Sequence, residues 1–419
     1  MNVHGRSHFI FLILYVFIGC SKNDKPLEPI APPVTPPARM GEVIYDFPDN
    51  CGIEVRNIIK TSINDYFIVG TKPLIQNNGL GPCEYFPFIQ RINNKGNVSF
   101  RIYPFTNIIS RAESIVETDK AFFIQLFAFV QGSTEFLPNS LELVKMDKDG
   151  NILWSKRYDN TNEIYKISKL SDGNLMVMGA FETKSFLMKL DLEGNILFRK
   201  DYDQEKLYYG SFSEIIEEEQ GFTFLAYRKQ TIALTEKWIY PQICKTDKSG
   251  AILSRVEVDS LNESYWWIQQ LQLLKKPDSG YFFMEIPAER HGLSGQGFGY
   301  VDKRILKVLN NKGAVLSSID LDMACSIRLG YISDCVQTPE GELFILALLN
   351  ISPAAPWIST IIKIDKNGSY IKHKSFSNFG DRFSIAMTLM DDNNIMVLNN
   401  VPRTNSFSVY KVNRNLEIQ

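Results

Sequence analysis

Short apolar runs separated by polar turns recur along most of the chain. The pattern is clearest at residues 143–158, LVKMDKDGNILWSKRY, where two extended runs flank Asp147-Lys148-Asp149-Gly150. Asp suits the first position of a type I turn, and Gly suits the left-handed position that follows it. The segment therefore predicts a β-hairpin.

Near-copies of this hairpin repeat about 54 residues apart, a spacing that fits units of four short strands. Asn or Asp stands three residues before the turn glycine from residue 93 onward, and Lys or Arg stands five before it in six of seven copies. Leu416 holds the glycine place in the last copy. The repeated glycines are Gly41, Gly96, Gly150, Gly194, Gly250, Gly313 and Gly368.

A second signal, a polar turn followed by an apolar run, precedes each hairpin, as in SDGNLMVMG from Ser171 and EGELFILAL from Glu340. Each unit then has four strands, A to D, joined by a tight turn, a loop and the repeated turn. No segment shows a sustained 3.6-residue apolar period, so an all-β chain is expected. Such sheets bury both faces when they are arranged radially, as in a β-propeller.

The two ends of the repeat region complement each other. Residues 40–47, MGEVIYDF, match a strand D without its A, B and C, while strands A, B and C end the chain from about residue 381. We therefore predict a seven-bladed β-propeller of four-stranded antiparallel blades over residues 41–419. The N-terminal strand completes the C-terminal blade, and this closure protects two sheet edges.

The N-terminus has the layout of a secretory signal over residues 1–19, with one Arg and an apolar run at residues 9–18 that is too short to span a bilayer. Residues 17–20, FIGC, resemble a bacterial lipobox, which implies lipidation of Cys20. The following residues, 21–24, resemble a surface-export tag of Gram-negative lipoproteins. Residues 20–40 are expected to form a Pro-rich tether. We expect a lipid-anchored monomer at the outer membrane or cell surface, with the membrane as a partner through its anchor.

Charge and cysteine content narrow the classes further. The net charge of −2 provides no basic stripe for nucleic acid. Six cysteines fit an oxidising compartment, with Cys51–Cys83 and Cys325–Cys335 as candidate disulfides. Cys244 lies in an apolar run and is expected to be buried. No Cys/His cluster indicates a metal site.

The repeat resembles the blades of secreted bacterial propellers. Asp147, Gly150 and Trp154 resemble the tryptophan-docking motif of quinoprotein dehydrogenase blades. In two other copies of the repeat, the position of Trp154 is taken by Phe100 and Phe198. The resemblance implies the propeller architecture and inter-blade packing by these residues. We expect no quinone or other cofactor.

The predicted blade has two unlike ends. The A–B and C–D turns form a tight-turn end, and the B–C and D–A connections form a long-loop end. Irregular loops are expected there at residues 71–86, 131–140, 228–240, 287–300 and 350–359, and such loops commonly carry binding sites. An alternative is that their aromatic rings only fill gaps beneath the loops. The ligand-binding candidates are Tyr85, Trp238, Tyr240, Trp266, Arg290, His291 and Trp357.

No catalytic residue can be assigned. Outside the signal only His291 and His373 could serve a Ser-His-Asp system, and neither accompanies a GxSxG motif. Residues 217–219, EEE, are interpreted as a solvated A–B hairpin, and the Gly-rich stretch from His291 lacks the Lys-Ser/Thr of a phosphate loop. We therefore expect a non-catalytic module that binds a glycan or an envelope protein. The alternative is a polysaccharide-acting hydrolase or lyase with paired carboxylates near the propeller axis.

Overall fold

The structure is a computed structural model in which all the described residues belong to the compact unit Thr35–Gln419. The described residues are 42–47, 53–74, 84–104, 110–128, 141–161, 163–181, 184–202, 206–207, 215–233, 236–258, 261–262, 270–286, 304–327, 329, 331–349, 358–376, 383–401 and 406–419. Within these ranges no helix has the length and apolar character needed to cross a membrane.

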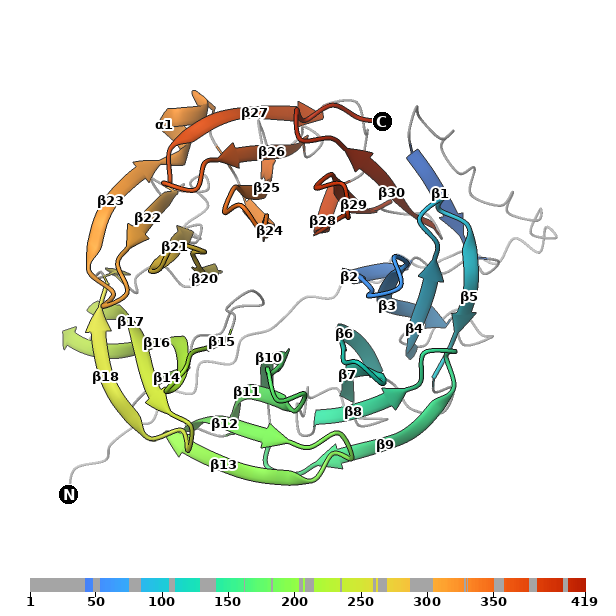
Figure 1. Ribbon diagram of the computed structural model, residues 1–419, viewed down its shortest axis with the longest axis horizontal. Helices are drawn as coiled ribbons and strands as arrows, with labels where there is room; N and C mark the ends of the chain where they lie inside the picture. Colours follow the sequence, from blue (N-terminus) through green and yellow to red (C-terminus); the bar gives the residue numbers. More distant parts are fainter. Residues whose placement is uncertain are drawn as a thin grey trace, which may run out of the picture. The chain divides into compact units, whose positions relative to one another are not determined.

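The described strands form seven antiparallel sheets arranged as the blades of a propeller ring, which confirms the predicted fold class (Figure 1). Blade 1 contains β2 (Glu54–Lys60), β3 (Tyr66–Leu74), β4 (Glu84–Ile92) and β5 (Val98–Ile102). Blade 2 contains β6 (Ser110–Glu117), β7 (Phe122–Ala128), β8 (Leu141–Met146) and β9 (Ile152–Tyr158). Blade 3 contains β10 (Glu163–Lys169), β11 (Leu175–Phe181), β12 (Lys184–Leu190) and β13 (Ile196–Tyr202).

Blade 4 has six strands, namely β14 (Lys206–Leu207), β15 (Ile216–Glu217), β16 (Gly221–Ala233), β17 (Glu236–Asp247), β18 (Ile252–Glu257) and β19 (Leu261–Asn262). Blade 5 contains β20 (Gln270–Lys275), β21 (Tyr281–Ile286), β22 (Ile305–Leu309) and β23 (Val315–Asp320). Blade 6 contains β24 (Tyr331–Gln337), β25 (Leu343–Leu349), β26 (Ile358–Ile364) and β27 (Tyr370–Phe376). Blade 7 combines β28 (Phe383–Leu389), β29 (Ile395–Asn400) and β30 (Ser406–Val412) with β1 (Glu42–Asp46).

The composite blade 7 is confirmed. Strand β1 pairs antiparallel with β30, from Glu42 opposite Tyr410 to Asp46 opposite Ser406. Phe47, just after β1, packs edge-on against Phe88 of blade 1, with ring centroids 4.9 Å apart. The N-terminal strand therefore joins the C-terminal blade and also contacts the blade that follows it around the ring.

The repeated turn owes its sequence to local hydrogen bonds. The Asp147 carboxylate accepts the backbone N–H groups of Asp149 at 2.9 Å and Asn151 at 2.8 Å, which explains the Asn or Asp at this place in the repeats. Gly150 has a φ of +98°, a left-handed value that suits glycine. Leu416 takes the equivalent place with a φ of +61°.

In five blades the repeated cation five residues before the glycine pairs with an acid in the A–B turn of its own blade, whereas Lys145 of blade 2 pairs with Glu193 of blade 3. The nitrogen and oxygen atoms of the pair lie 2.7 Å apart for Arg91 and Asp65 and 2.9 Å apart for Lys363 and Glu342. The corresponding pairs in other blades are Lys189–Asp172, Lys245–Glu218 and Lys411–Asp392. The sequence spacing therefore encodes a cross-link between the two tight turns of one blade.

Trp154 packs between blades, as the resemblance implied. A Cβ atom added to Gly194 of blade 3 would lie 2.8 Å from the Trp154 ring of blade 2. The Tyr158 hydroxyl donates to the Gly194 carbonyl at 2.8 Å, so the same glycine receives two side chains from the preceding blade. Phe100 has the same relation to Gly150.

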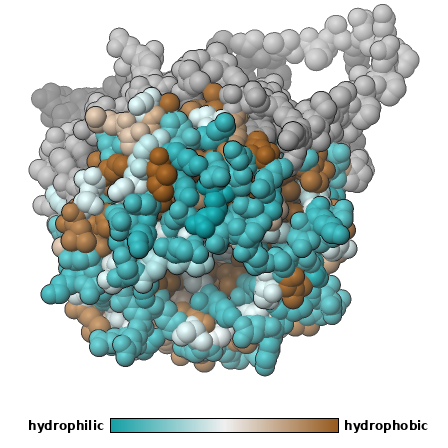
Figure 2. All heavy atoms as spheres, turned by 45° about the horizontal axis from the view of Figure 1, so that its top comes forward, coloured by the Kyte–Doolittle hydropathy of each residue, from teal (hydrophilic) through white to brown (hydrophobic). Residues whose placement is uncertain are grey.

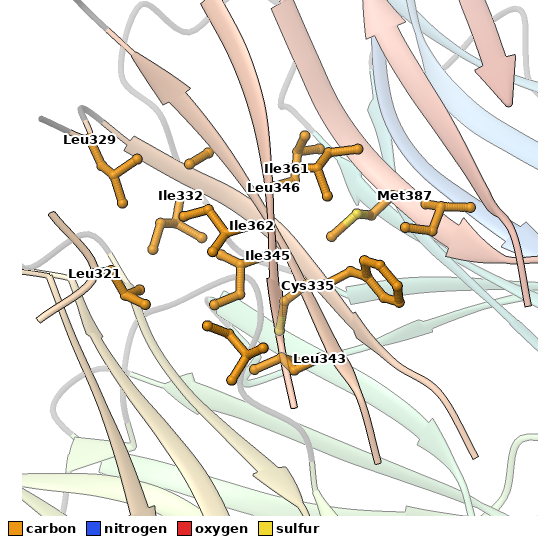
Figure 3. Close-up of a cluster of buried hydrophobic side chains, with 14 of the residues drawn as sticks. Leu321, Leu329, Ile332, Cys335, Leu343, Ile345, Leu346, Ile361, Ile362 and Met387 are labelled. Carbon is orange, nitrogen blue, oxygen red and sulfur yellow. The ribbon is translucent and has the colours of Figure 1, made fainter. Parts of the chain in front are cut away.

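The contact between blades 5, 6 and 7 contains an aliphatic cluster that includes Leu343, Ile345 and Ile362 (Figure 3). A short helix, α1 (Leu321–Cys325), follows β23 and adds Leu321 to this cluster; its first turn is capped by Asp320, which accepts the Met323 N–H at 3.1 Å. This helix is a local exception to the predicted all-β chain.

The predicted Cys325–Cys335 disulfide is absent. Cys325 ends α1 and is a buried free thiol, while Cys335 lies inside β24 among the aliphatic side chains of Figure 3. Burial raises the pKa of the Cys325 thiol to about 12. Both residues act as small apolar packing groups, as the buried Cys244 was expected to do. Cys51 and Cys83 lie outside the described residues.

Candidate functional site

Blade 4 extends furthest at the long-loop end among the described parts of the chain. Its strands β16 and β17 are 13 and 12 residues long. The irregular loop predicted over residues 228–240 is wrong, because most of it is a paired hairpin with Arg228 opposite Tyr240 and Gln230 opposite Trp238. Short strands flank both arms: β14 pairs with β16, and β19 pairs with β17. These flanking strands supply the hydrogen bonds that let a polar sequence remain extended.

We call β14, β19 and the hairpin arms 227–233 and 236–241 the blade-4 extension. It contains two of the ligand-binding candidates, Trp238 and Tyr240, at alternate positions of β17. Tyr85 lies in β4 of blade 1, opposite Pro73. The remaining predicted site residues, Cys20, Trp266, Arg290, His291 and Trp357, lie outside the described residues.

His373 occupies the ordinary strand D position that the sequence indicated. It lies in β27, and its Nδ1 is 2.8 Å from the Tyr370 hydroxyl. This partner belongs to the same strand, and the pair lies on the outer strand of its blade (Figure 1). Nothing in this contact indicates a catalytic histidine.

A group that the sequence did not reveal lies on the strands nearest the axis (Figure 1). Arg56 of β2 contacts Glu54 of the same strand, with Nη2 and Oε1 2.8 Å apart, and its Nε lies 3.9 Å from Oε2 of Glu113 in β6. The side chains are 30%, 43% and 29% exposed, respectively. Two carboxylates from neighbouring blades therefore flank one guanidinium near the long-loop end of the axis.

Irregular strand pairing positions this group. The register of β2 against β3 shifts between Val55 and Asn57, and that of β6 against β7 shifts between Ala112 and Ser114, so Arg56 and Glu113 are left out of the ladders. Bulges re-aim side chains and are frequent beside functional sites. Similar shifts occur in β10, β24 and β28. No local sequence signal identifies these bulges, because they depend on the partner strand.

The axial group consists of one guanidinium between two carboxylates. Arg56 Nε is buried and makes no hydrogen bond within the described structure, and the Glu113 carboxylate faces it at 3.9 Å. Guanidinium and carboxylate groups together can bind both the acidic and the hydroxyl groups of a sugar. Among the described residues no set of three His, Cys, Asp or Glu side chains could hold a metal ion.

The interpretation of residues 217–219 as a solvated hairpin is wrong for the first two glutamates. Glu217 accepts the backbone N–H of Ser171 at 2.6 Å and its hydroxyl at 2.9 Å, which ties blade 4 to blade 3. Burial by itself raises the pKa of Glu217, but these hydrogen bonds and Lys248 outweigh it and hold the pKa below its usual range. Glu218 accepts the Tyr281 hydroxyl of blade 5. Both residues are structural ties at the tight-turn end.

No protein-family model matches the sequence, and no curated protein is similar to it in sequence. Solved structures resemble it in fold. An ulvan lyase of polysaccharide lyase family PL25 matches with a TM-score of 0.52 and 9% identity, over 88% of this chain and 96% of that one. The β-propeller domain of the trilobed protease from Pyrococcus furiosus matches with a TM-score of 0.51 and 11% identity, over 86% and 93% of the chains.

These similarities show a β-propeller fold alone, because both identities are far below the level at which function is shared. The archaeal domain is described as having an open velcro topology. In this chain, by contrast, β1 closes the ring by pairing with β30.

Proposed function

We propose that this protein is a membrane-anchored propeller that binds a glycan or another envelope protein at its long-loop end without catalysis. The blade-4 extension is the observation that carries this proposal. It prolongs one blade at the long-loop end and places Trp238 and Tyr240 in one strand of the prolonged part. Aromatic side chains on a rigid scaffold offer large contact areas at low entropic cost.

The anchor belongs to the same proposal. Cys20 is the acylated residue, the tether follows it, and the protein is held at the outer membrane or cell surface. Detergent partitioning tests this directly: the wild-type chain should enter the detergent phase, and Cys20→Ala should remain in the aqueous phase. A wild-type chain found wholly in the aqueous phase would refute the anchor.

The binding test uses the purified full chain on a glycan array, followed by affinity measurement on any hit. Trp238→Ala and Trp357→Ala should each weaken binding about tenfold or more, as expected when a central aromatic contact is lost. Ile63→Ala is the matched control, because Ile63 is an exposed apolar residue in an A–B turn at the opposite end. If both Trp variants bound as tightly as the wild type, a binding site at the long-loop end that includes Trp238 and Trp357 would be excluded.

The second candidate is a polysaccharide-acting enzyme, and the axial group of Glu54, Arg56 and Glu113 favours it. Two carboxylates on adjacent blades are the minimum that glycoside hydrolysis needs. A hydrolysis assay on every glycan bound in the array separates the two proposals. Activity that is lost in Glu54→Gln and in Glu113→Gln, with binding retained, would replace the binding proposal by the enzyme.

A further inference from the structure

Buried polar atoms without hydrogen bonds gather where blade 1 meets blade 2. Four such atoms have no partner within the described structure, namely Arg56 Nε, Asn57 Oδ1, Thr71 Oγ1 and Ser110 Oγ. Thr71 and Ser110 are 0% exposed. A buried polar group that makes no hydrogen bond costs stability, and its presence in a folded protein needs an explanation.

The alternation of the strands turns Thr71 and Ser110 toward each other's blade. Phe67 and Val69 of β3 belong to one apolar cluster with Ala112 of β6, and Thr71 follows them on the same face of the sheet. Ser110 precedes Ala112 by two residues, so it faces blade 1. The apolar contact between the two blades therefore becomes polar toward the long-loop end.

The axial group lies on the same side of blade 1. Glu54 stands opposite Thr71 in the ladder of β2 and β3, and Asn57 stands opposite Val69. Residues that stand opposite each other share a face of the sheet, so Glu54 and Asn57 also face blade 2. We call the polar end of this contact the interblade polar site, which consists of Glu54, Arg56, Asn57, Thr71, Ser110 and Glu113.

The geometry of this site fits a hydroxyl group. Arg56 Nε and Glu113 Oε2 lie 3.9 Å apart, which is too far for a direct hydrogen bond. A hydroxyl oxygen about 2.9 Å from both atoms would accept from the guanidinium and donate to the carboxylate. The unpaired Asn57 Oδ1 offers a further acceptor. A carboxylate or sulfate ligand could only accept, and an ammonium group could only donate.

The charge of the site favours a neutral ligand. Two carboxylates flank one guanidinium, and Arg111 alternates with Ser110 and Ala112, so it faces away from blade 1. An acidic sugar would therefore meet a net negative charge. Calcium also binds hydroxyl and carboxylate oxygens, but the Arg56 guanidinium among them opposes a cation.

The described surface shows where polar and apolar groups lie. Apolar groups form separate clusters among hydrophilic residues on the face that Figure 2 draws. Interfaces with other proteins commonly have an apolar centre, and the described part of this face shows no wide apolar patch. A polar ligand agrees better with such a surface.

We propose that the interblade polar site binds a neutral sugar residue of a glycan through its hydroxyl groups. This inference rests on the proposed binding of a glycan and narrows it, because it names the class of sugar and adds a contact near the axis to the one at the blade-4 extension. Polar atoms that lower the stability of the free protein gain partners when the sugar binds. Such a loss of stability is common at binding sites.

The test measures binding on the glycan array and the melting temperature of the purified full chain. Asn57→Leu and Thr71→Val each remove an unpaired polar atom and nearly keep the shape of the side chain. Each should raise the melting temperature or leave it unchanged, because a buried group without a partner is removed. Each should weaken binding to neutral glycans about tenfold, because a hydrogen bond to the sugar is lost.

Thr118→Val is the matched control. Thr118 is buried at the tight-turn end, and its hydroxyl donates to the Ala121 carbonyl at 2.9 Å. This variant should lower the melting temperature and bind glycans like the wild type. The opposite pattern at Thr71, a lower melting temperature with unchanged binding, would show that Thr71 has a structural role only and would overturn the inference.

The outcomes separate this inference from the proposed function. If either Asn57→Leu or Thr71→Val binds neutral glycans like the wild type, the inference is overturned, and the effect of Trp238→Ala decides the proposed function separately. Array hits confined to uronates and sulfated sugars would also overturn it. An array without any hit would overturn it as well and leave only an envelope protein as the proposed partner.

Discussion

Ser62 donates its backbone N–H and its hydroxyl to the two carboxylate oxygens of Glu117, each at 2.7 Å. Ser62 lies in the A–B turn of blade 1, and Glu117 is the last residue of strand A in blade 2. Ser171 and Glu217 repeat this relation between blades 3 and 4. Ion pairs occupy the same places at Asp119–Lys169 and Asp391–Lys60. The tight-turn end is thus held from blade to blade, and the pair Asp391–Lys60 does so across the closure.

Replacing Glu117 should destabilise the ring. Glu117→Ala removes the carboxylate that accepts the Ser62 N–H and pairs with Lys148, whose Nζ still donates to the Thr118 carbonyl, and we expect the free energy of unfolding to fall by about 2 kcal/mol. Urea unfolding at pH 7 measures this. Asp149→Ala is a suitable control, because Asp149 is exposed at a neighbouring turn tip and should change stability little.

The same contact predicts a dependence on pH. Burial by itself raises the pKa of Glu117, but hydrogen bonds from Lys148 and Ser62 outweigh it and keep the pKa below its usual range. A carboxyl whose pKa is lower in the folded state stabilises the fold above its unfolded pKa of about 4.3, and this stabilisation is lost as the pH falls through the folded value. Melting temperatures from pH 7 to pH 3 should therefore fall less steeply in Glu117→Gln than in the wild type. Parallel curves would contradict this role.

The docking of Trp154 on Gly194 predicts a difference between two glycines. Gly173→Ala and Gly194→Ala both place a side chain at a positive φ, which costs about 1–2 kcal/mol. A Cβ atom at Gly173 meets nothing within 4 Å, whereas one at Gly194 lies 2.7 Å from the Tyr158 hydroxyl. Gly194→Ala should therefore cost about 2 kcal/mol more. If Gly173→Ala and Gly194→Ala lowered the melting temperature equally, the side chains around Gly194 would have to move aside without measurable cost.

The composite blade predicts a large effect of a small deletion. Removing residues 40–47 takes away β1 and the contacts of Tyr45 and Phe47, and the melting temperature should fall by about 10 °C or more. Tyr45→Phe removes only the hydrogen bond from its hydroxyl to the Gly96 carbonyl and should cost about 1 kcal/mol. Unchanged melting and solubility after the deletion would contradict closure by β1.

The cysteines are expected to differ in their reaction with thiol reagents. Cys325 is buried with a raised pKa, so a thiol reagent at pH 8 should label it only in denaturant. Cys51 and Cys83 are expected to form a disulfide worth about 3–4 kcal/mol in the chain-entropy model. Non-reducing peptide mapping tests the pair, and labelling of both Cys51 and Cys83 in the native chain would exclude it.

The fold was predictable because its determinants are local and repeated. Asp147 and Gly150 specify a turn from their own hydrogen bonds and φ angle, and seven such turns fix the number of blades. The missing strand at each end predicted the pairing of β1 with β30. The Trp154 contact followed from its motif, since the motif itself describes two neighbouring blades.

The features that the sequence did not predict depend on contacts between strands that are distant along the chain. Arg56 and Glu113 meet only because bulges in two separate strands turn them together. The extended arms around Arg228 and Trp238 have no apolar alternation and are held by the distant strands β14 and β19. Cys325 and Cys335 are ten residues apart along the chain and belong to one hydrophobic cluster, yet one ends a helix, the other lies inside a strand, and no disulfide joins them. Glu217 was misjudged because its partner, Ser171, belongs to another blade.

The union of β1 with β30 also sets an order of assembly. Strand β1 is the first of the described strands to be made, and its partner, β30 (Ser406–Val412), is the last of them. During synthesis β1 therefore lacks this partner until the other described strands have been made. A chain interrupted anywhere before residue 406 would keep both an orphan first strand and an open edge. Closure thus acts as a check on length, because only a polypeptide that has been made through to its final blade can become a ring.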